Sequence, residues 1–320
     1  MVPYEIKKVP EHTGTLLEQL GSKRKFWYTD PKNPKDLLFK QGREGTGEDW
    51  AEKVTFELCK ILGIPSACYH LGCYGSKQGV ISETIVPENG RLVHGDELLQ
   101  KFDSCYGTQD VNINKEHNIR TVAAYFKAAG DKVRLPLTWT PLPGINTAQG
   151  VFAGYLMFDT LISNQDRHHQ NWGVIVDGEK IHLAETFDHA SSLGRNESDE
   201  MKQSCLEQKQ RRSVEGYVKK AKSAFFTQGE RRRRVPTIDA FFEFSTHCSD
   251  EALSWLERLE LVTEDYVVRI FERLPDSWPI DPPRDIISDT AVRFAVQMIL
   301  LNKERLIAAR NSLLERKGTL

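Results

Sequence analysis

The stretch Asn164-Gln-Asp166-Arg-His168-His-Gln-Asn171 is the most informative part of this chain. It is the most polar short segment of the sequence, and the apolar residues 148–163 before it predict a buried helix. Two strands are predicted after it, over residues 172–187, with a hairpin turn at Asp177-Gly178. The segment is therefore a loop between a buried helix and a hairpin, and Asp188 stands at the end of that hairpin.

The spacing of three side chains in this region fits phosphoryl transfer. Asp166 and Asn171 have the D-x-x-x-x-N separation of a kinase catalytic loop, and Asp188 follows where a metal-binding aspartate would face that loop. The reaction needs a carboxylate to orient and deprotonate the acceptor hydroxyl, together with oxygen ligands for Mg²⁺. Taken alone, the loop is better explained as a solvated connection, because loops favour such polar residues.

The first ninety residues predict several strands and one helix. Lys25–Thr29 and Asp36–Lys40 are strand-like and are separated by a proline-rich turn, which predicts a hairpin. A helix with Thr46 in its capping signal follows. Lys40 ends its strand and Glu52 lies in the first turns of the helix, so the two can meet as a kinase-type Lys–Glu pair. Taken singly, each is more often an ordinary surface charge.

Two more strand-like segments precede a change in the pattern. Cys68–Leu71 and Gly79–Val86 both favour strands, and Pro87-Glu-Asn-Gly90 is where we place the boundary between two lobes. Beyond this boundary the pattern is mainly helical, and the clearest helices are predicted over residues 251–259, 264–274 and 289–314.

The overall composition is that of a folded protein. The 320 residues include 43 Lys+Arg and 45 Asp+Glu, a net charge of −2, which argues against a surface built throughout for polyanions. No apolar run reaches the roughly 18 residues of a membrane span, and the N-terminus has no secretory-signal pattern, so we expect a cytoplasmic protein. The six cysteines are scattered without a C-x-x-C pair, which favours buried or inactive thiols.

One basic stretch departs from this average. Residues 201–235 contain 11 Lys+Arg and 3 acids, a local net charge of +8. A solvated helical face is the simplest interpretation. The functional alternatives are docking of an acidic protein partner and contact with a nucleic-acid backbone, although few aromatic residues are available for base stacking.

Signals for other chemistry are weak. The sequence contains no G-x-S-x-G, H-E-x-x-H or G-x-x-x-x-G-K-[ST] motif. A metallohydrolase site built from His168, His169 and His189 with Asp166 and Asp188 is the remaining alternative. Adjacent histidines seldom point at one metal, which makes this the less favoured hypothesis.

Several segments together resemble the HipA-like serine/threonine kinase family. The likeness extends over about residues 14–194, and the D-R-H-x-x-N form of the loop is also similar to that of phosphatidylinositol kinases, which share this fold. The segments that carry it are Asn164–Trp172, Phe187-Asp-His-Ala-Ser-Ser-Leu-Gly194, Gly47-Glu-Asp-Trp-Ala-Glu52-Lys and Leu62-Gly-Ile-Pro65.

The resemblance implies a role for each matching residue. Asp166 would be the catalytic base, Asn171 and Asp188 the Mg²⁺ ligands, Lys40 the contact to the α- and β-phosphates of ATP, and Glu52 its partner. A second group would complete ATP binding and phosphate positioning: Gly21, Ser22, Lys23 and Lys25 in the phosphate-covering loop, Glu83 and Ile85 in the adenine-binding hinge, and His168 beside the phosphates.

The sequence also departs from the family pattern. The covering loop has no G-x-G-x-x-G motif, and Asp188-His-Ala has no glycine after the aspartate, which removes the basis for an ordinary activation-loop switch. The chain begins almost at the covering loop, so we expect it to lack the extra N-terminal subdomain of HipA proper, and an antitoxin-type partner is not indicated. By analogy with the family's regulatory loop serine, Ser22, Thr13 and Thr15 are candidate self-modification sites.

We therefore predict an α+β, two-lobed protein-kinase-like fold. A small β-rich lobe over residues 1–90 and a larger, mainly helical lobe over residues 91–320 would hold ATP and Mg²⁺ between them. The predicted activity is transfer of the γ-phosphate to Ser/Thr of a protein substrate, with the chain itself as a further acceptor. The alternatives are a lipid or inositol acceptor, transfer of AMP, and a nucleotide-binding regulatory module without catalysis.

Overall fold

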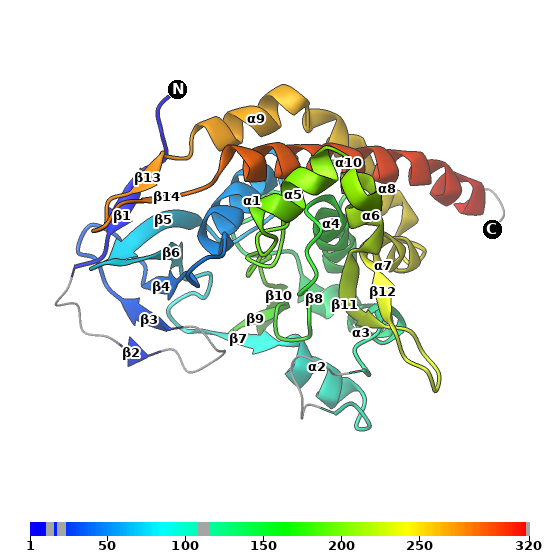
Figure 1. The fold of residues 1–320 in the computed structure, drawn as a ribbon. Coiled ribbons are helices and arrows are strands. Elements are labelled where there is room, and N and C mark those ends of the chain that lie inside the picture. Colours follow the sequence, from blue (N-terminus) through cyan, green and yellow to red (C-terminus); the bar gives the residue numbers. More distant parts are fainter. Residues whose placement is uncertain (11–15, 18–23, 108–114, 318–320) are drawn as a thin grey trace.

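The structure is a computed structural model and describes residues 1–10, 16–17, 24–107 and 115–317. It has the predicted α+β, two-lobed, kinase-like architecture, with a β-rich lobe beside a larger lobe of helices (Figure 1). The smaller lobe contains a six-stranded sheet in the order β1-β5-β6-β4-β3-β2 and one helix. Its elements are β1 (Ile6–Lys8), β2 (Leu16–Leu17), β3 (Lys25–Tyr28), β4 (Leu37–Gln41), α1 (Glu48–Leu62), β5 (Tyr69–Tyr74) and β6 (Lys77–Glu83).

The predicted hairpin and helix are both present in this lobe. β3 and β4 pair antiparallel, and Lys25 lies opposite Lys40. The expected cap of α1 is wrong by one residue, because Gly47 precedes the helix and the Thr46 hydroxyl donates instead to the Arg43 carbonyl. A Cβ atom at Gly47 would lie 2.0 Å from the indole nitrogen of Trp50, so only glycine lets that ring fold back here.

The rest of the described chain combines a four-stranded sheet, β7-β9-β10-β8, with nine helices and two short hairpins, of which β13–β14 lies beside the smaller lobe (Figure 1). The short strands β7, β8 and β11–β14 were missed in the sequence, because they lack a long alternating pattern. Its elements are β7 (Gly90–His94), α2 (Gly95–Phe102), α3 (Ile119–Ala129), β8 (Val133–Arg134), α4 (Ala148–Leu161), β9 (Gly173–Asp177), β10 (Lys180–Leu183), α5 (Asp199–Leu206), α6 (Val214–Lys220), β11 (Lys222–Phe226), β12 (Arg234–Pro236), α7 (Thr237–Ser245), α8 (Ser249–Arg258), α9 (Glu264–Glu272), β13 (Ser277–Trp278), β14 (Arg284–Asp285) and α10 (Asp289–Lys317).

One predicted strand ends early, and this difference shapes the site. β10 stops at Leu183 instead of continuing to Phe187. The chain after it turns toward the smaller lobe, where Thr186 N donates to the Pro65 carbonyl at 3.0 Å and Ala67 N donates to the Thr186 carbonyl at 2.9 Å. These bonds replace pairing within the hairpin and place Asp188 next to the smaller lobe.

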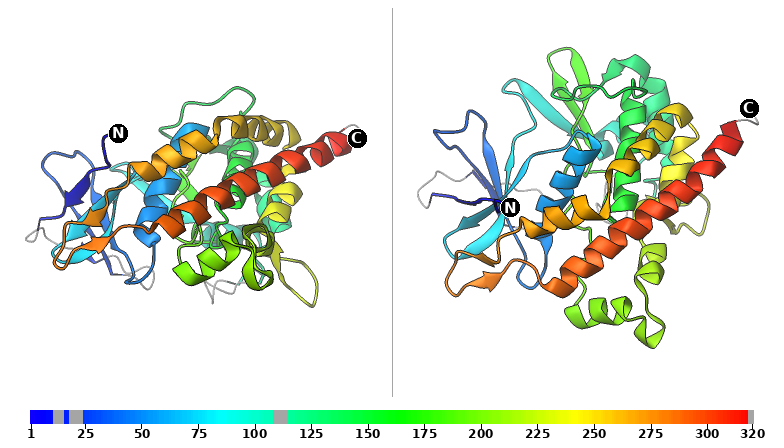
Figure 2. Two further views of the ribbon diagram at one scale, coloured as in Figure 1. Left: turned by 45° about the horizontal axis from the view of Figure 1, so that its top comes forward. Right: turned by 90° about the horizontal axis from the view of Figure 1, so that it is seen from above.

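The core of the molecule surrounds α4. Every residue of this helix except Gln149 is buried, as its continuous apolar pattern predicts. α10 packs against α4, α8 and α9, and Figure 2 shows α9 and α10 side by side along the molecule. No helix in the described part of the chain combines the length and apolar character needed to span a bilayer. The six cysteines form no disulfide, and Cys105 alone among them is exposed.

Candidate active site

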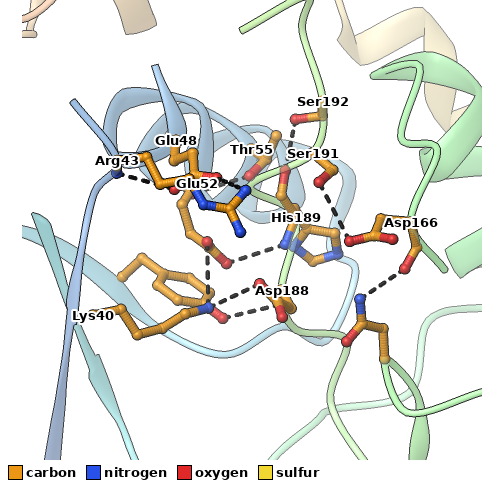
Figure 3. Close-up of polar contacts among 12 residues, drawn as sticks. Lys40, Arg43, Glu48, Glu52, Thr55, Asp166, Asp188, His189, Ser191 and Ser192 are labelled. Atoms are coloured by element: carbon orange, nitrogen blue, oxygen red, sulfur yellow. Dashed lines mark hydrogen bonds and ion pairs between the residues drawn. The ribbon is translucent and has the colours of Figure 1, made fainter. Parts of the chain in front are cut away.

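Strand β4 and helix α1 bring a lysine and a glutamate to the face of the sheet that meets the larger lobe. Lys40 Nζ lies 2.9 Å from Asp188 Oδ1 and 3.6 Å from Glu52 Oε2, as Figure 3 shows. Burial lowers the pKa of Lys40, but the carboxylates of Asp188 and Glu52 raise it more, so its pKa lies well above the usual value. The predicted Lys–Glu pair is therefore formed, and the lysine carries its positive charge.

Glu52 also fixes the backbone next to Asp188. Its Oε1 accepts from His189 N at 3.1 Å, while its Oε2 faces Lys40. Asp188 has a left-handed backbone with φ +59°, and its N–H donates to the Tyr69 hydroxyl oxygen at 3.1 Å. These contacts hold the Asp188 side chain, which is 36% exposed, toward the space between the lobes.

The loop between α4 and β9 presents Asp166 at the same space. The Asp166 side chain is 46% exposed, and its backbone carbonyl accepts from Asn171 Nδ2 at 2.7 Å. Asp166 N donates to Asn164 Oδ1 at 3.1 Å, and Ser191 Oγ donates to Asp166 Oδ2 at 3.3 Å. The D-x-x-x-x-N spacing thus closes a compact loop, because Asn171 bonds directly to the residue five positions before it.

The pKa of Asp166 is raised above its ordinary value. Partial burial is the largest cause, and the nearby Asp188 carboxylate acts in the same direction. His168, the hydroxyl of Ser191 and the guanidinium of Arg234 oppose the rise. A raised pKa makes this carboxylate a stronger base than an exposed aspartate.

A buried ion pair beneath the loop was missed in the sequence. Arg167 and Asp159 have side chains only 1% and 5% exposed, and the guanidinium donates two bonds to the carboxylate, at 2.8 and 2.7 Å. Arg167 also donates to the Asn171 carbonyl at 2.8 Å and lies 3.2 Å from His189 Nε2. An aspartate inside an otherwise apolar helix was the available signal, since a buried charge needs a partner.

A second missed feature links α1 to Asp166. The buried Glu48 forms an ion pair with Arg195, whose Nη2 donates to Ser191 Oγ at 3.1 Å. Ser191 in turn donates to the Asp166 carboxylate at 3.3 Å (Figure 3). Glu48 and Arg195 are 147 positions apart, so nothing local in the sequence indicated this chain of contacts.

The histidines proposed for a metallohydrolase do not converge. His168 Nε2 lies 4.0 Å from Asp166 Oδ1, and burial lowers the pKa of His168. His169 Nδ1 bonds to the Tyr106 hydroxyl at 2.9 Å. His189 Nε2 bonds to the Thr186 hydroxyl at 2.8 Å. The three imidazoles have separate partners, which removes the geometric basis for that alternative.

The remaining residues predicted to bind ATP differ in their positions and contacts in the structure. Lys25 shares a face with Lys40, because directly opposite residues of paired strands point the same way. Ile85 packs in one cluster with Phe187, next to Asp188. The Glu83 carboxylate instead accepts from Asn33 Nδ2 at 3.2 Å and pairs with Lys35 at 3.6 Å. Outside the described residues lie the predicted positions Gly21, Ser22, Lys23, Thr13 and Thr15.

The basic residues 201–235 do not form one helical face. They are distributed over α5, α6 and the β11–β12 hairpin. Lys202 and Lys219 pair with Asp199 and Glu215 on their own helices. The expected single helical face is therefore wrong, because the stretch folds into parts of two separate helices and a hairpin.

Comparison with known proteins establishes the fold. No protein-family model matches the chain, and no curated protein sequence matches it. The structure is similar to that of the Helicobacter pylori proinflammatory kinase CtkA, with a TM-score of 0.68 and 17% identity, covering 95% of this chain and 97% of CtkA. It is also similar to HipA of Shewanella oneidensis, solved with HipB and operator DNA, with a TM-score of 0.50 and 14% identity. That match covers 91% of this chain and 64% of HipA. At these identities the likeness shows a shared kinase fold.

Proposed function

We propose that the protein is an ATP- and Mg²⁺-dependent kinase of the HipA-like family that phosphorylates Ser/Thr hydroxyls of a protein. One observation carries the proposal: Lys40, Glu52 and Asp188 form a charged cluster directly beside Asp166 and Asn171. Five residues from four separate segments of the chain have the identities that phosphoryl transfer requires, and they meet in one place.

The donor set fits a phosphate-bound Mg²⁺. Asp188 offers a partly exposed carboxylate, and the bond from Asn171 to Asp166 uses the amide nitrogen and not the carbonyl oxygen. Oxygen ligands of this kind suit Mg²⁺, which would neutralise charge on the phosphates when bound. Lys40 would hold the α- and β-phosphates, and its pairing with Glu52 keeps the amine charged and in position.

Asp166 would orient the acceptor hydroxyl and take its proton on a carboxylate oxygen. Its exposed side chain can be reached by a hydroxyl, and the raised pKa favours acceptance of a proton. His168, whose Nε2 lies 4.0 Å from the same carboxylate, would contact the transferred phosphoryl group. The presence of all these groups favours catalysis over a purely regulatory nucleotide-binding role.

Intact-mass spectrometry after incubation with ATP and Mg²⁺ tests the proposal. Phosphorylation of the chain or of an added protein acceptor adds about 80 Da per site, whereas transfer of AMP adds about 329 Da. Asp166→Asn should slow transfer by about 10²- to 10⁴-fold. Asp265→Asn, on the exposed face of α9, is the matched control and should leave transfer unchanged.

Three results would contradict the proposal. Full activity of both Asp166→Asn and Asp188→Asn would show that this site does not perform the chemistry. A gain of AMP would identify a different transfer reaction, and phosphorylation of a lipid or inositol in place of protein would identify a different acceptor class.

A further inference from the structure

The β11–β12 hairpin contacts the loop that carries Asp166. The Arg234 guanidinium donates to the backbone carbonyl of Gln165, the neighbour of Asp166. Lys222 N donates to Gln165 Oε1 at 3.4 Å, so both strands of the hairpin bond to the same residue. Arg234 is close enough to Asp166 to lower the pKa of that carboxylate. The most basic segment of the chain therefore begins beside the proposed catalytic base.

The base of the hairpin is held firmly against the larger lobe. Phe225 is fully buried and stacks on the His117 ring with a centroid distance of 4.2 Å. Phe226 N donates to the His117 carbonyl at 2.9 Å, and Ser223 Oγ donates to the Val235 carbonyl at 2.8 Å. These contacts give the hairpin a defined position relative to Asp166, while its tip projects from the body of the molecule (Figure 1).

Exposed cations lie at both ends of the hairpin, with Lys222 at its open end and Arg231 and Arg233 toward its tip. Lys222, Arg231 and Arg233 are exposed, and within the described residues they form no ion pair with an acid. Lys202 and Lys219, in the same basic stretch, do pair with acids. Charges left exposed beside a reactive site favour a partner of opposite sign.

A groove on one flank of the hairpin is lined by acidic as well as basic side chains. Arg232 lines this groove of about 310 Å³ together with Asp103 and Glu116. Lys115 also lines the groove, so acidic and basic side chains alternate there and offer an acidic ligand no uniformly basic surface. The acid-binding group therefore consists of Lys222, Arg231 and Arg233, and we call these three residues the hairpin cations.

We propose that the hairpin cations bind an acidic segment of the protein acceptor and so direct a neighbouring Ser or Thr to Asp166. The proposal rests on the function proposed above and adds the chemistry of the substrate: a hydroxyl residue accompanied by Asp or Glu. The contact between Arg234 and Gln165 explains the coupling, because docking at the hairpin occurs next to the loop that receives the hydroxyl.

Two observations favour an acidic polypeptide over a nucleic acid. The aromatic residues of the hairpin, Phe225 and Phe226, are buried and offer no stacking surface for bases. The neighbouring site also carries Asp166 and Asp188, which would repel a continuous phosphate backbone. A polypeptide can place its acids at the hairpin and an uncharged hydroxyl at Asp166.

Binding is measured first, because it does not depend on catalysis. Fluorescence anisotropy would compare a labelled Ser peptide flanked by Asp and Glu, the same peptide with Asn and Gln, and a single-stranded oligonucleotide of equal charge. We expect the acidic peptide to bind tightest, and the triple variant Lys222→Gln/Arg231→Gln/Arg233→Gln to bind it about tenfold more weakly. Arg211→Gln/Arg212→Gln removes two exposed cations from the same stretch outside the hairpin and is the matched control.

Equal binding of the acidic and neutral peptides would overturn the proposal, as would equal losses in the triple and control variants. Tighter binding of the oligonucleotide would overturn it in favour of a nucleic-acid surface.

A phosphorylation assay distinguishes failure of this proposal from failure of the proposed function. If neither the chain nor any added protein or peptide acceptor gains phosphate from ATP, the kinase assignment fails while the binding result still stands. If mass gain occurs but a randomised Ser/Thr peptide library shows no preference for acids, the acceptor proposal fails alone.

Discussion

Asp49 is a buried carboxyl group in the first turn of α1, and burial raises its pKa to about 6. Its oxygens accept from Trp50 N at 2.9 Å and from Gln78 Nε2 at 3.0 Å, which only partly offsets the cost of burial. The sequence placed this residue in a helix-start signal and gave no indication of its burial, because the covering side chain comes from β6.

Asp49→Asn should therefore stabilise the protein at neutral pH. The folded-state pKa lies above the ordinary value of 3.8, so the contribution of Asp49 to stability falls as pH rises from about 4 to 6. The full cost above that range is about 3 kcal/mol. Urea unfolding should show the largest gain at pH 7.5 and a smaller one at pH 5. Asp265→Asn is the exposed control, and an equal gain at both pH values would contradict the argument.

Ser191 is a positioning residue for Asp166. Its hydroxyl donates to the carboxylate, which stabilises the charged form and lowers the pKa of Asp166. Ser191→Ala should raise that pKa, so the acid limb of kcat/KM should move to higher pH and the rate should fall several-fold. Ser191→Thr retains the hydroxyl and should restore the profile. An unchanged acid limb in the alanine variant would show that Ser191 has only a structural role.

At the scale of elements, the Arg167–Asp159 ion pair joins α4 to two functional segments. Arg167 contacts the Asn171 carbonyl in the loop after α4 and His189 next to Asp188. One buried guanidinium thus sets the relative positions of the helix, the loop and the segment after β10. The apolar pattern predicted α4, and the D-x-x-x-x-N spacing predicted the chemistry of the loop that follows it. Neither pattern indicated that the buried Arg167–Asp159 ion pair holds the loop in position.

Arg167→Met should destabilise the protein by about 3–5 kcal/mol, because it leaves Asp159 buried without a counter-charge. The double variant Asp159→Leu/Arg167→Met removes both charges and should recover part of the loss. Urea unfolding measures both effects, and the exposed α9 pair is tested by Arg269→Met as a control that changes stability little. A double variant no more stable than the single one would contradict the explanation.

At the scale of the whole molecule, one hydrophobic core extends through both lobes. Trp50 and Leu58 from α1 belong to the same buried cluster as Phe152 from α4 and Trp255 from α8. The Arg258 guanidinium also donates to the Leu62 carbonyl at the end of α1. The smaller lobe is therefore attached through its helix, while its sheet faces the proposed nucleotide site.

This continuity predicts a single unfolding transition. Thermal unfolding followed by circular dichroism and by tryptophan fluorescence should give coincident curves, because the lobes share buried contacts. Addition of ATP and Mg²⁺ should shift the transition to higher temperature, since a ligand that binds only the folded state stabilises it. Two separated transitions would show that the lobes unfold independently.

The sequence alone determined the local elements and the identities of the reactive groups. The apolar run of α4, the loop that follows it and the β3–β4 hairpin follow from local patterns of hydrophobicity, turns and charge, whereas the sequence indicated only that Lys40 and Glu52 could meet. Tertiary structure alone decided the contacts of Ser191 with Asp166, of Arg195 with Glu48 and of the hairpin with Gln165. Local patterns indicate where helices, strands and loops occur and which of their faces are apolar. Which distant side chain a residue contacts depends on how the core packs, and core packing depends on residues throughout the chain.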